Sequence, residues 1–194
     1  MPAESFLRGK LVELSAIQHS DLPVIAGWSR DAEMLGNQFY GLLYPETLED
    51  VTLEFEQQHG TAWETMESLK ELPFAIRQQN SEEIVGVIQF KQFDWRSLCA
   101  EVGISIGNRD YWSKGFGTDA MRVMLRYGFM ELGLNRVELF VFDFNERAIR
   151  SYEKAGFQRE GSQRESIYRD GQFHDQIVMG ILRSEWDALP DDQR

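Results

Sequence analysis

The sequence predicts an α/β fold of the α+β kind, with a central β-sheet, helices packed on it and a C-terminal β-hairpin. Two observations predict this class. Strand-like segments dominate after Pro73, and helical segments interrupt them without a regular strand–helix–strand alternation. The pair Asp170-Gly171 also stands between two β-rich runs, as in a tight hairpin turn. With 194 residues and no repeat or linker, residues 1–194 are expected to form a single domain.

The part of the chain before Pro73 is expected to contribute one short strand and several helices. Ser20 and Asp21 are candidate helix caps, and Pro23 suits the first turn of the helix that follows. Apolar residues spaced by three or four positions mark the later helices. The predicted elements are a strand at 10–15 and helices at 23–30, 46–58 and 61–71.

After Pro73 the strand signals become strong. In the segment 99–106, apolar residues alternate with Glu101, Gly103 and Ser105, as in a strand with two different faces. Helices are bounded by cap residues, such as Asn145 before one of them and glycines after them. The predicted elements are strands at 74–79, 84–90, 99–106 and 136–142, helices at 118–132 and 145–155, and a hairpin of 157–169 with 173–182.

Composition and charge narrow the classes of function. Hydrophobic residues make up 42% and charged residues 27%, which is typical of a globular protein. The 20 basic and 32 acidic residues give a net charge of −12. This charge disfavours a nucleic-acid partner, which needs a basic surface. It suits a cationic partner such as an amine, although solubility alone also explains it.

The chain is predicted to hold no disulfide, metal site or membrane segment. Cys99 is the single cysteine, and the three histidines are scattered along the sequence. No stretch approaches the roughly 18 apolar residues of a membrane helix. The acidic start without a long apolar run does not fit a signal peptide, so a cytoplasmic location is expected.

A glycine loop between a predicted strand and a predicted helix is the first functional candidate. Free N–H groups at a helix start, next to glycines, favour an anion such as a diphosphate, although an ordinary turn is the alternative. Lys114 precedes Gly115, so a Walker A loop is excluded. Gly115, Gly117 and Ala120 do satisfy a dinucleotide pattern, with Glu138 at the spacing of a ribose ligand, so an NAD-dependent oxidoreductase is kept as an alternative.

The stretch from Ala100 to Leu182 resembles a GNAT-superfamily N-acetyltransferase, specifically the branch of RimJ/RimL-like and spermidine acetyltransferases. The superfamily loop Q/R-x-x-G-x-G/A appears here with Trp112 at its first position, where an aromatic residue is common in this branch. The helix downstream is similar to the second cofactor motif of the family. The matching segments are 111–120, Asn145-x-x-Ala148-x-x-x-Tyr152-x-x-x-Gly156-Phe157, Glu160-Gly161, Arg164-Glu165 and Tyr168-Arg169-Asp170-Gly171-x-x-x-Asp175.

This resemblance implies a mixed, mostly antiparallel sheet and acetyl-CoA as acetyl donor, without a metal. Residues of about 10–95 would then shape the acceptor site, and residues of about 96–182 would hold acetyl-CoA. Independently, a spacing of seven places Asn145 and Tyr152 on one helix face, where a pantetheine arm could pass. The expected cofactor-binding residues are Ile104, Ile106, Trp112, Ser113, Lys114, Gly115, Phe116, Gly117, Thr118, Asn145, Ile149 and Tyr152.

Two residues are candidates for catalysis by direct attack of an amine. Tyr152 would donate a proton to the departing thiolate, as the family tyrosine is thought to do. Glu101 would accept a proton, unless it forms a structural ion pair or no base is needed. Gly103 would permit a bulge that frees backbone N–H groups of the strand.

The acceptor and the partners stay open at this level. A protein N-terminus, a polyamine or another small amine all fit the resemblance and the acidic chain. A catalytically silent domain that binds acyl-CoA as a sensor is the alternative function. A homodimer is compatible with the resemblance, but no surface for it is identified.

Overall fold

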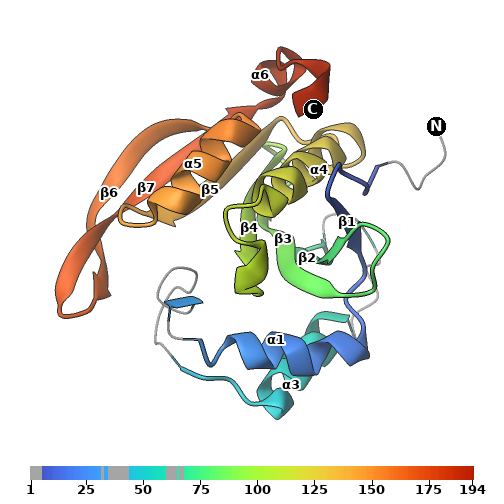
Figure 1. Ribbon diagram of the computed structural model, residues 1–194. Coiled ribbons are helices and arrows are strands. Elements are labelled where there is room, and N and C mark those ends of the chain that lie inside the picture. Colours follow the sequence, from blue (N-terminus) through green and yellow to red (C-terminus); the bar gives the residue numbers. More distant parts are fainter. Residues whose placement is uncertain (1–5, 32, 35–43, 60–64, 66–67) are drawn as a thin grey trace.

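The computed structural model describes residues 6–31, 33–34, 44–59, 65 and 68–194, and these residues form a seven-stranded sheet. The strand order is β1-β2-β3-β4-β5-β7-β6 (Figure 1). Strands β4 and β5 pair in parallel, and the other neighbours pair antiparallel. The predicted mixed, mostly antiparallel sheet is therefore confirmed. The strands are β1 (Val12–Ser15), β2 (Glu71–Gln78), β3 (Ile84–Asp94), β4 (Cys99–Ile106), β5 (Arg136–Phe142), β6 (Gln158–Arg169) and β7 (Gln172–Leu182).

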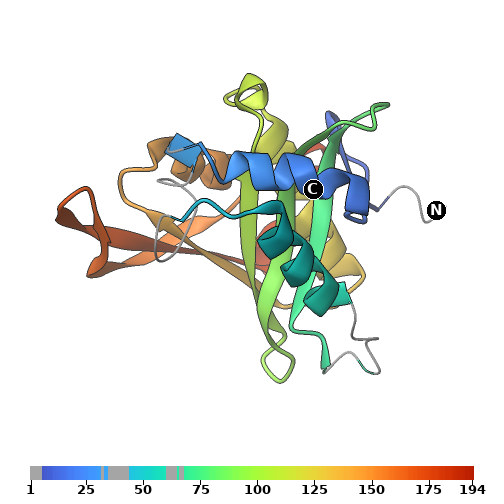
Figure 2. The same cartoon turned by 90° about the horizontal axis from the view of Figure 1, so that it is seen from below.

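Helices cover both faces of the sheet. Helices α1 and α3 lie on one face, and α4 and α5 lie on the other (Figures 1 and 2). The hairpin of β6 and β7 extends beyond the rest of the sheet (Figure 1). No helix among the described residues is long and apolar enough to cross a membrane. The helices are α1 (Leu22–Trp28), α3 (Leu48–His59), α4 (Phe116–Met130), α5 (Glu146–Ala155) and α6 (Arg183–Asp187), with 3₁₀ turns η2 (His19–Asp21), η4 (Arg109–Tyr111) and η5 (Asp191–Gln193).

The main core lies between the sheet and helix α4. Met121, Met124 and Leu125 of α4 are fully buried, together with inward-facing residues of the central strands such as Ile88 and Phe90. Because apolar burial is the largest favourable contribution to folding, this layer fixes α4 and its first turn relative to β4.

Local chemistry explains the element ends that the sequence predicted correctly. Asp170 and Gly171 both have positive φ, 48° and 81°, as a two-residue hairpin turn requires. The Asn145 side chain accepts a hydrogen bond from the N–H of Ala148 over 3.2 Å, and so caps α5. Gly156 ends the same helix in the left-handed region, at φ 105°.

Several predicted boundaries were wrong, among them the end of the strand expected at 84–90, which continues to Asp94 as β3. Helix α4 begins at Phe116, two residues early, because Gly115 at φ 90° is already its N-cap. Strand β2 includes Pro73, which has no backbone N–H to donate. This is tolerated because β1 pairs only with Ala75–Gln78, so that no neighbouring strand on the β1 side requires a hydrogen bond from residue 73. The helix expected at 61–71 does not reach Glu71, the first residue of β2; residues 60–64 and 66–67 lie outside the described residues.

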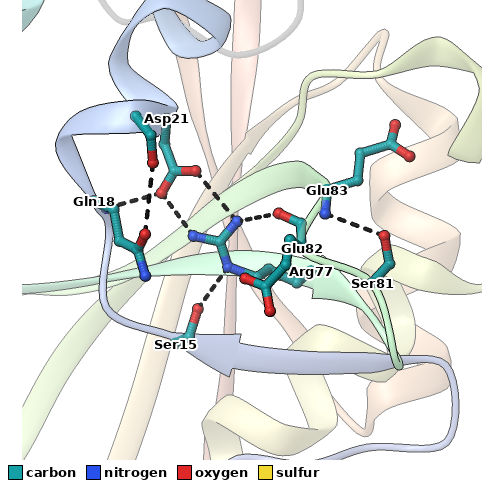
Figure 3. Close-up of polar contacts among 8 residues, drawn as sticks. Ser15, Gln18, Asp21, Arg77, Ser81, Glu82 and Glu83 are labelled. Atoms are coloured by element: carbon teal, nitrogen blue, oxygen red, sulfur yellow. Dashed lines mark hydrogen bonds and ion pairs between the residues drawn. The ribbon is translucent and has the colours of Figure 1, made fainter.

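A buried ion pair holds the start of α1 against the sheet (Figure 3). Arg77 Nη2 of β2 lies 2.7 Å from Asp21 Oδ2, and Arg77 also donates to the Ser15 hydroxyl over 2.9 Å and to the Glu82 carbonyl over 2.5 Å. The Asp21 carboxylate accepts the backbone N–H of Gln18 over 2.8 Å as well. Asp21 was expected to cap the helix, but its side chain makes no such hydrogen bond and pairs with Arg77 instead.

Candidate functional site

Strands β4 and β5 separate after a short parallel pairing. Their register covers only Cys99–Glu101 of β4, whereas β3 pairs with β4 as far as Ile106. Gly107 donates its N–H to the Val85 carbonyl of β3 over 3.0 Å. Because donor direction alternates along an antiparallel strand, the N–H groups of Val102, Ile104 and Ile106 point away from β3, into the gap. The bulge expected at Gly103 is not found, because this register is continuous.

A cleft of about 660 Å³ occupies this gap and continues below helices α1 and α3. Most of the predicted site residues line it. Three of them do not: Phe116 and Ile149 are buried in the core, and Lys114 is exposed on the loop. The predicted residues that line the cleft are Glu101, Ile104, Ile106, Trp112, Ser113, Gly115, Gly117, Thr118, Asn145 and Tyr152.

The glycine loop connects the end of β4 to the first turn of α4. Trp112 donates its indole N–H to the carbonyl oxygen of Ile106 over 2.6 Å, so its ring covers the end of β4. The hydroxyl groups of Thr118 and Ser151 lie 2.8 Å apart and join α4 to α5. The first N–H groups of α4 have no carbonyl partner within the helix, which makes this end of the cleft suitable for an anion.

Helix α5 presents Asn145 and Tyr152 to the cleft, as the spacing predicted. Tyr152 also packs edge-on against Phe157, with ring centroids 6.2 Å apart. Burial raises the pKa of Tyr152 to about 12, and the positive charge of Arg147 opposes part of this rise. The phenol therefore keeps its proton at neutral pH and can act as a hydrogen-bond donor or an acid.

Glu101 lies in an ion pair on the floor of the cleft. Its carboxylate is 3.0 Å from the ammonium group of Lys91, the residue opposite it in β3, and the two side chains are 13% and 22% exposed. Both residues line the cleft. The structural ion pair that the sequence left as an alternative is thus present, and a role as base would require Glu101 to act while paired.

Sequence reasoning missed a cluster of charged residues around Trp112. The guanidinium carbon of Arg147 lies 3.6 Å from the centroid of the Trp112 ring, and that of Arg109 lies 5.4 Å away. Arg109 pairs with both Asp31 and Glu33, residues that follow α1, and its hydrogen bonds lower the pKa of Asp31 to about 2. Arg109 thus balances the charge of both acids at this position.

The periodicity of α5 offered a signal for the missed cations. Arg147, Ser151 and Lys154 are spaced by four and three residues, which places them on one side of the helix. All three line the cleft, as does Arg150. The wall formed by α5 is therefore basic, in a chain whose net charge is −12.

The opposite wall, under α1 and α3, is apolar and acidic. Glu46 and Glu54 line it among side chains of Leu22, Val51 and Phe55. Burial, followed by repulsion from neighbouring acids, raises the pKa of both Glu46 and Glu54. A cation bound near them would relieve both effects, so this wall favours a positively charged or amine-bearing ligand.

The structure does not support the NAD-dependent alternative, because its expected ribose ligand, Glu138, lies in the wrong place. Glu138 accepts hydrogen bonds from Arg136, pairs in register with Glu101 near the start of β5, and does not line the cleft. It is therefore not at the strand end where a ribose ligand would be needed. Within the described parts of the chain, no group of three or more His, Cys, Asp or Glu side chains could hold a metal ion.

Comparisons with known proteins agree with this geometry. The family model "Acetyltransferase (GNAT) domain" matches residues 12–158. An uncharacterized N-acetyltransferase of Bacillus subtilis (strain 168), YoaA, is 29% identical over 146 residues, which are 75% of this chain and 80% of YoaA. The spermidine N(1)-acetyltransferase of Escherichia coli (strain K12) is 32% identical over 104 residues, covering 54% of this chain and 55% of that protein.

A similar solved structure supports the fold. The spermidine N-acetyltransferase from Vibrio cholerae, crystallised in complex with CoA and spermine, superposes with a TM-score of 0.78 at 23% identity, covering 91% of this chain and 98% of that chain. The family model spans well over half of this sequence, and it includes the diverging strands and the glycine loop. The chain therefore belongs to the GNAT acetyltransferase domain family and is an acyltransferase of the N-acetyltransferase type.

Proposed function

We propose that this protein transfers an acetyl group from acetyl-CoA to a primary amine, by direct attack of the amine on the thioester. The observation that carries the proposal is the arrangement of one continuous cleft. The freed N–H edge of β4 lies along it, between a basic end at α4 and α5 and an acidic end at α1 and α3. The polyanionic donor thus meets a basic end of the cleft, and the cationic form of the amine acceptor meets an acidic end.

The residues along the basic end fit acetyl-CoA. When bound, acetyl-CoA supplies an acetyl thioester at one end of a pantetheine arm and a diphosphate at the other. The N–H groups from Gly115 to Thr118 would donate to the diphosphate. The N–H groups of Ile104 and Ile106, which lack a strand partner on that side, would bind the amides of the arm. Asn145 and Tyr152 line the other side of this path.

Two kinds of donor in the cleft serve the chemical step. An N–H group of β4, at Val102 or Ile104, would stabilise negative charge on the thioester oxygen. Tyr152, which keeps its proton at neutral pH, would give that proton to the departing thiolate. Glu101, paired with Lys91, would accept the proton released by the amine, directly or through water, or solvent would accept it.

The acceptor would bind at the acidic end, in the part of the chain of about 10–95. Glu46 and Glu54 favour a cation there, and Trp28, Leu22 and Phe55 offer apolar contacts. The relatives named above include spermidine acetyltransferases. A polyamine, another small amine and a protein N-terminus all satisfy this chemistry.

Thermal unfolding with acetyl-CoA, and with NAD and ATP as controls, tests the proposal first. A ligand that binds only the folded state must raise the melting temperature. We expect acetyl-CoA alone to do so, followed by release of free thiol with some member of an amine panel. No shift at millimolar acetyl-CoA would contradict the proposal. A shift without turnover on any amine would instead indicate an acyl-CoA-binding sensor.

A further inference from the structure

Arg147 is held in an unusual position at the mouth of the cleft. Its guanidinium lies against the face of Trp112, 3.6 Å from the ring centroid. The Trp112 ring is itself fixed by the 2.6 Å hydrogen bond from its N–H to the Ile106 carbonyl. A planar guanidinium that stacks on a fixed ring keeps its N–H groups in the plane, pointing outward. Arg147 is thus preorganised to donate hydrogen bonds at its edges.

In the part of the chain that the structure describes, the charge of Arg147 is not neutralised by a salt bridge. Glu33 acts on it only through space, since that carboxylate lies 2.7 Å from Arg109. Arg147 is half-buried, and burial lowers its pKa. A partly desolvated cation costs free energy unless an anion joins it, so an anionic ligand would be stabilised at this position.

The surroundings of Arg147 indicate which anion this is. Trp112 is the first residue of the glycine loop, of which Ser113, Gly115 and Gly117 line the same cleft. Ser151, one turn after Arg147 in α5, is hydrogen-bonded to Thr118 in the first turn of α4 over 2.8 Å. Arg147 therefore lies on the side of α5 that borders the N-terminus of α4.

We propose that Arg147 is a diphosphate-binding residue, which grips the CoA diphosphate from α5 while the glycine loop binds it from α4. This inference rests on the proposed function, because it requires CoA in the cleft. It adds a side chain, brought from a second helix, to a site otherwise made of backbone N–H groups. The bidentate fork of an arginine suits phosphate oxygens better than a lysine does.

Arg150 provides a matched control on the same helix. It also lines the cleft, but its guanidinium is exposed and pairs at 2.8 Å with Glu146, one turn earlier in the helix. Arg150→Gln removes the same charge as Arg147→Gln from a residue that already has a counterion. General attraction of an anion to the cleft is weakened equally by both substitutions, whereas a specific contact is lost only with Arg147.

Calorimetric dissociation constants for three ligands test the inference: CoA, 3′-dephospho-CoA and pantetheine, which lacks all phosphates. We expect Arg147→Gln to raise the dissociation constants of CoA and 3′-dephospho-CoA by about 10- to 100-fold, and to leave the dissociation constant of pantetheine unchanged. We expect Arg150→Gln to raise the dissociation constant of CoA by less than about threefold. Arg147→Lys keeps the charge but not the fork, and should give an intermediate loss with the same ligand pattern. It replaces the glutamine variant if that variant does not fold.

Several outcomes would overturn the inference. Equal weakening of all three ligands would mean that Arg147 supports the structure of the cleft. A loss confined to CoA would place the 3′-phosphate, not the diphosphate, at Arg147. Unchanged CoA binding with a raised KM for carboxylate-bearing amines would assign Arg147 to the acceptor. Failure of the unsubstituted protein to bind CoA would contradict the proposed function itself, which distinguishes the two failures.

Discussion

Trp112 and Ile106 are joined by a hydrogen bond of 2.6 Å from the indole N–H to the backbone carbonyl. This contact closes the free end of β4 at the point where β5 has already separated from it. It also fixes the ring on which Arg147 stacks. Trp112, the first residue of the glycine loop, thus connects the last residue of β4 with the basic wall of the cleft.

Trp112→Phe should weaken both the fold and the binding of CoA. The substitution leaves the Ile106 carbonyl without its donor, which costs about 1 kcal/mol of unfolding free energy. Chemical denaturation measures this loss, and calorimetry measures the CoA affinity. Trp95→Phe is the matched control, because the Trp95 indole N–H is buried and has no partner in the described structure. Equal losses for the two variants would show that the hydrogen bond contributes nothing.

Tyr152→Phe should lower kcat by about 10²- to 10⁴-fold and leave the dissociation constant of CoA nearly unchanged. The phenol would act only as the proton donor to the thiolate, and the ring would still line the cleft. Pre-steady-state release of thiol measures the chemical step directly. Activity of the variant equal to that of the unsubstituted protein from pH 6 to pH 10 would remove Tyr152 from the mechanism.

The raised pKa of Tyr152 also predicts a pH dependence of stability. An unfolded tyrosine loses its proton near pH 10, whereas folded Tyr152 keeps it to about pH 12. In this window the folded state binds more protons, so the free energy of unfolding decreases as pH rises, by up to about 3 kcal/mol. This contribution is fully present below pH 10. In urea titrations, Tyr152→Phe should show a shallower decrease than the unsubstituted protein.

Glu101→Gln should lower kcat by no more than about tenfold at pH 7, and the loss should shrink as pH rises. The pairing with Lys91 limits the carboxylate as a base, and a free amine needs less help once solvent deprotonates it. A pH–rate profile with one fixed amine gives the comparison. A loss above 100-fold that persists at pH 10 would show that Glu101 does more than accept the amine proton.

Glu54→Gln should raise the KM for a cationic amine by several-fold without changing the affinity for CoA. Glu54 lines the acceptor wall, where burial and Glu46 already disfavour its negative charge, so a bound cation stabilises it. Glu49→Gln removes an equal charge from the same helix at a residue that does not line the cleft. A KM that rises equally in both variants would indicate only long-range attraction.

The features of this protein that were predictable from its sequence are those that depend on neighbouring residues. The hairpin turn at Asp170-Gly171, the cap of α5 at Asn145 and its stop at Gly156 follow from backbone conformations that few residue types adopt. The approach of Asn145 and Tyr152 to one cleft follows from helical periodicity. The sequence also resembled the GNAT family, and the match of the family model to residues 12–158 confirmed that membership.

The contacts between side chains across the sheet were not predictable from the sequence, because they depend on the folded arrangement. The separation of β4 from β5, the pairing of Glu101 with Lys91 and the stacking of Arg147 on Trp112 each join segments that are distant along the chain. Their partners are selected by strand register and by the packing of α4 and α5 on the core. Local sequence patterns contain no record of that packing, because register and helix placement are set by the whole buried surface at once.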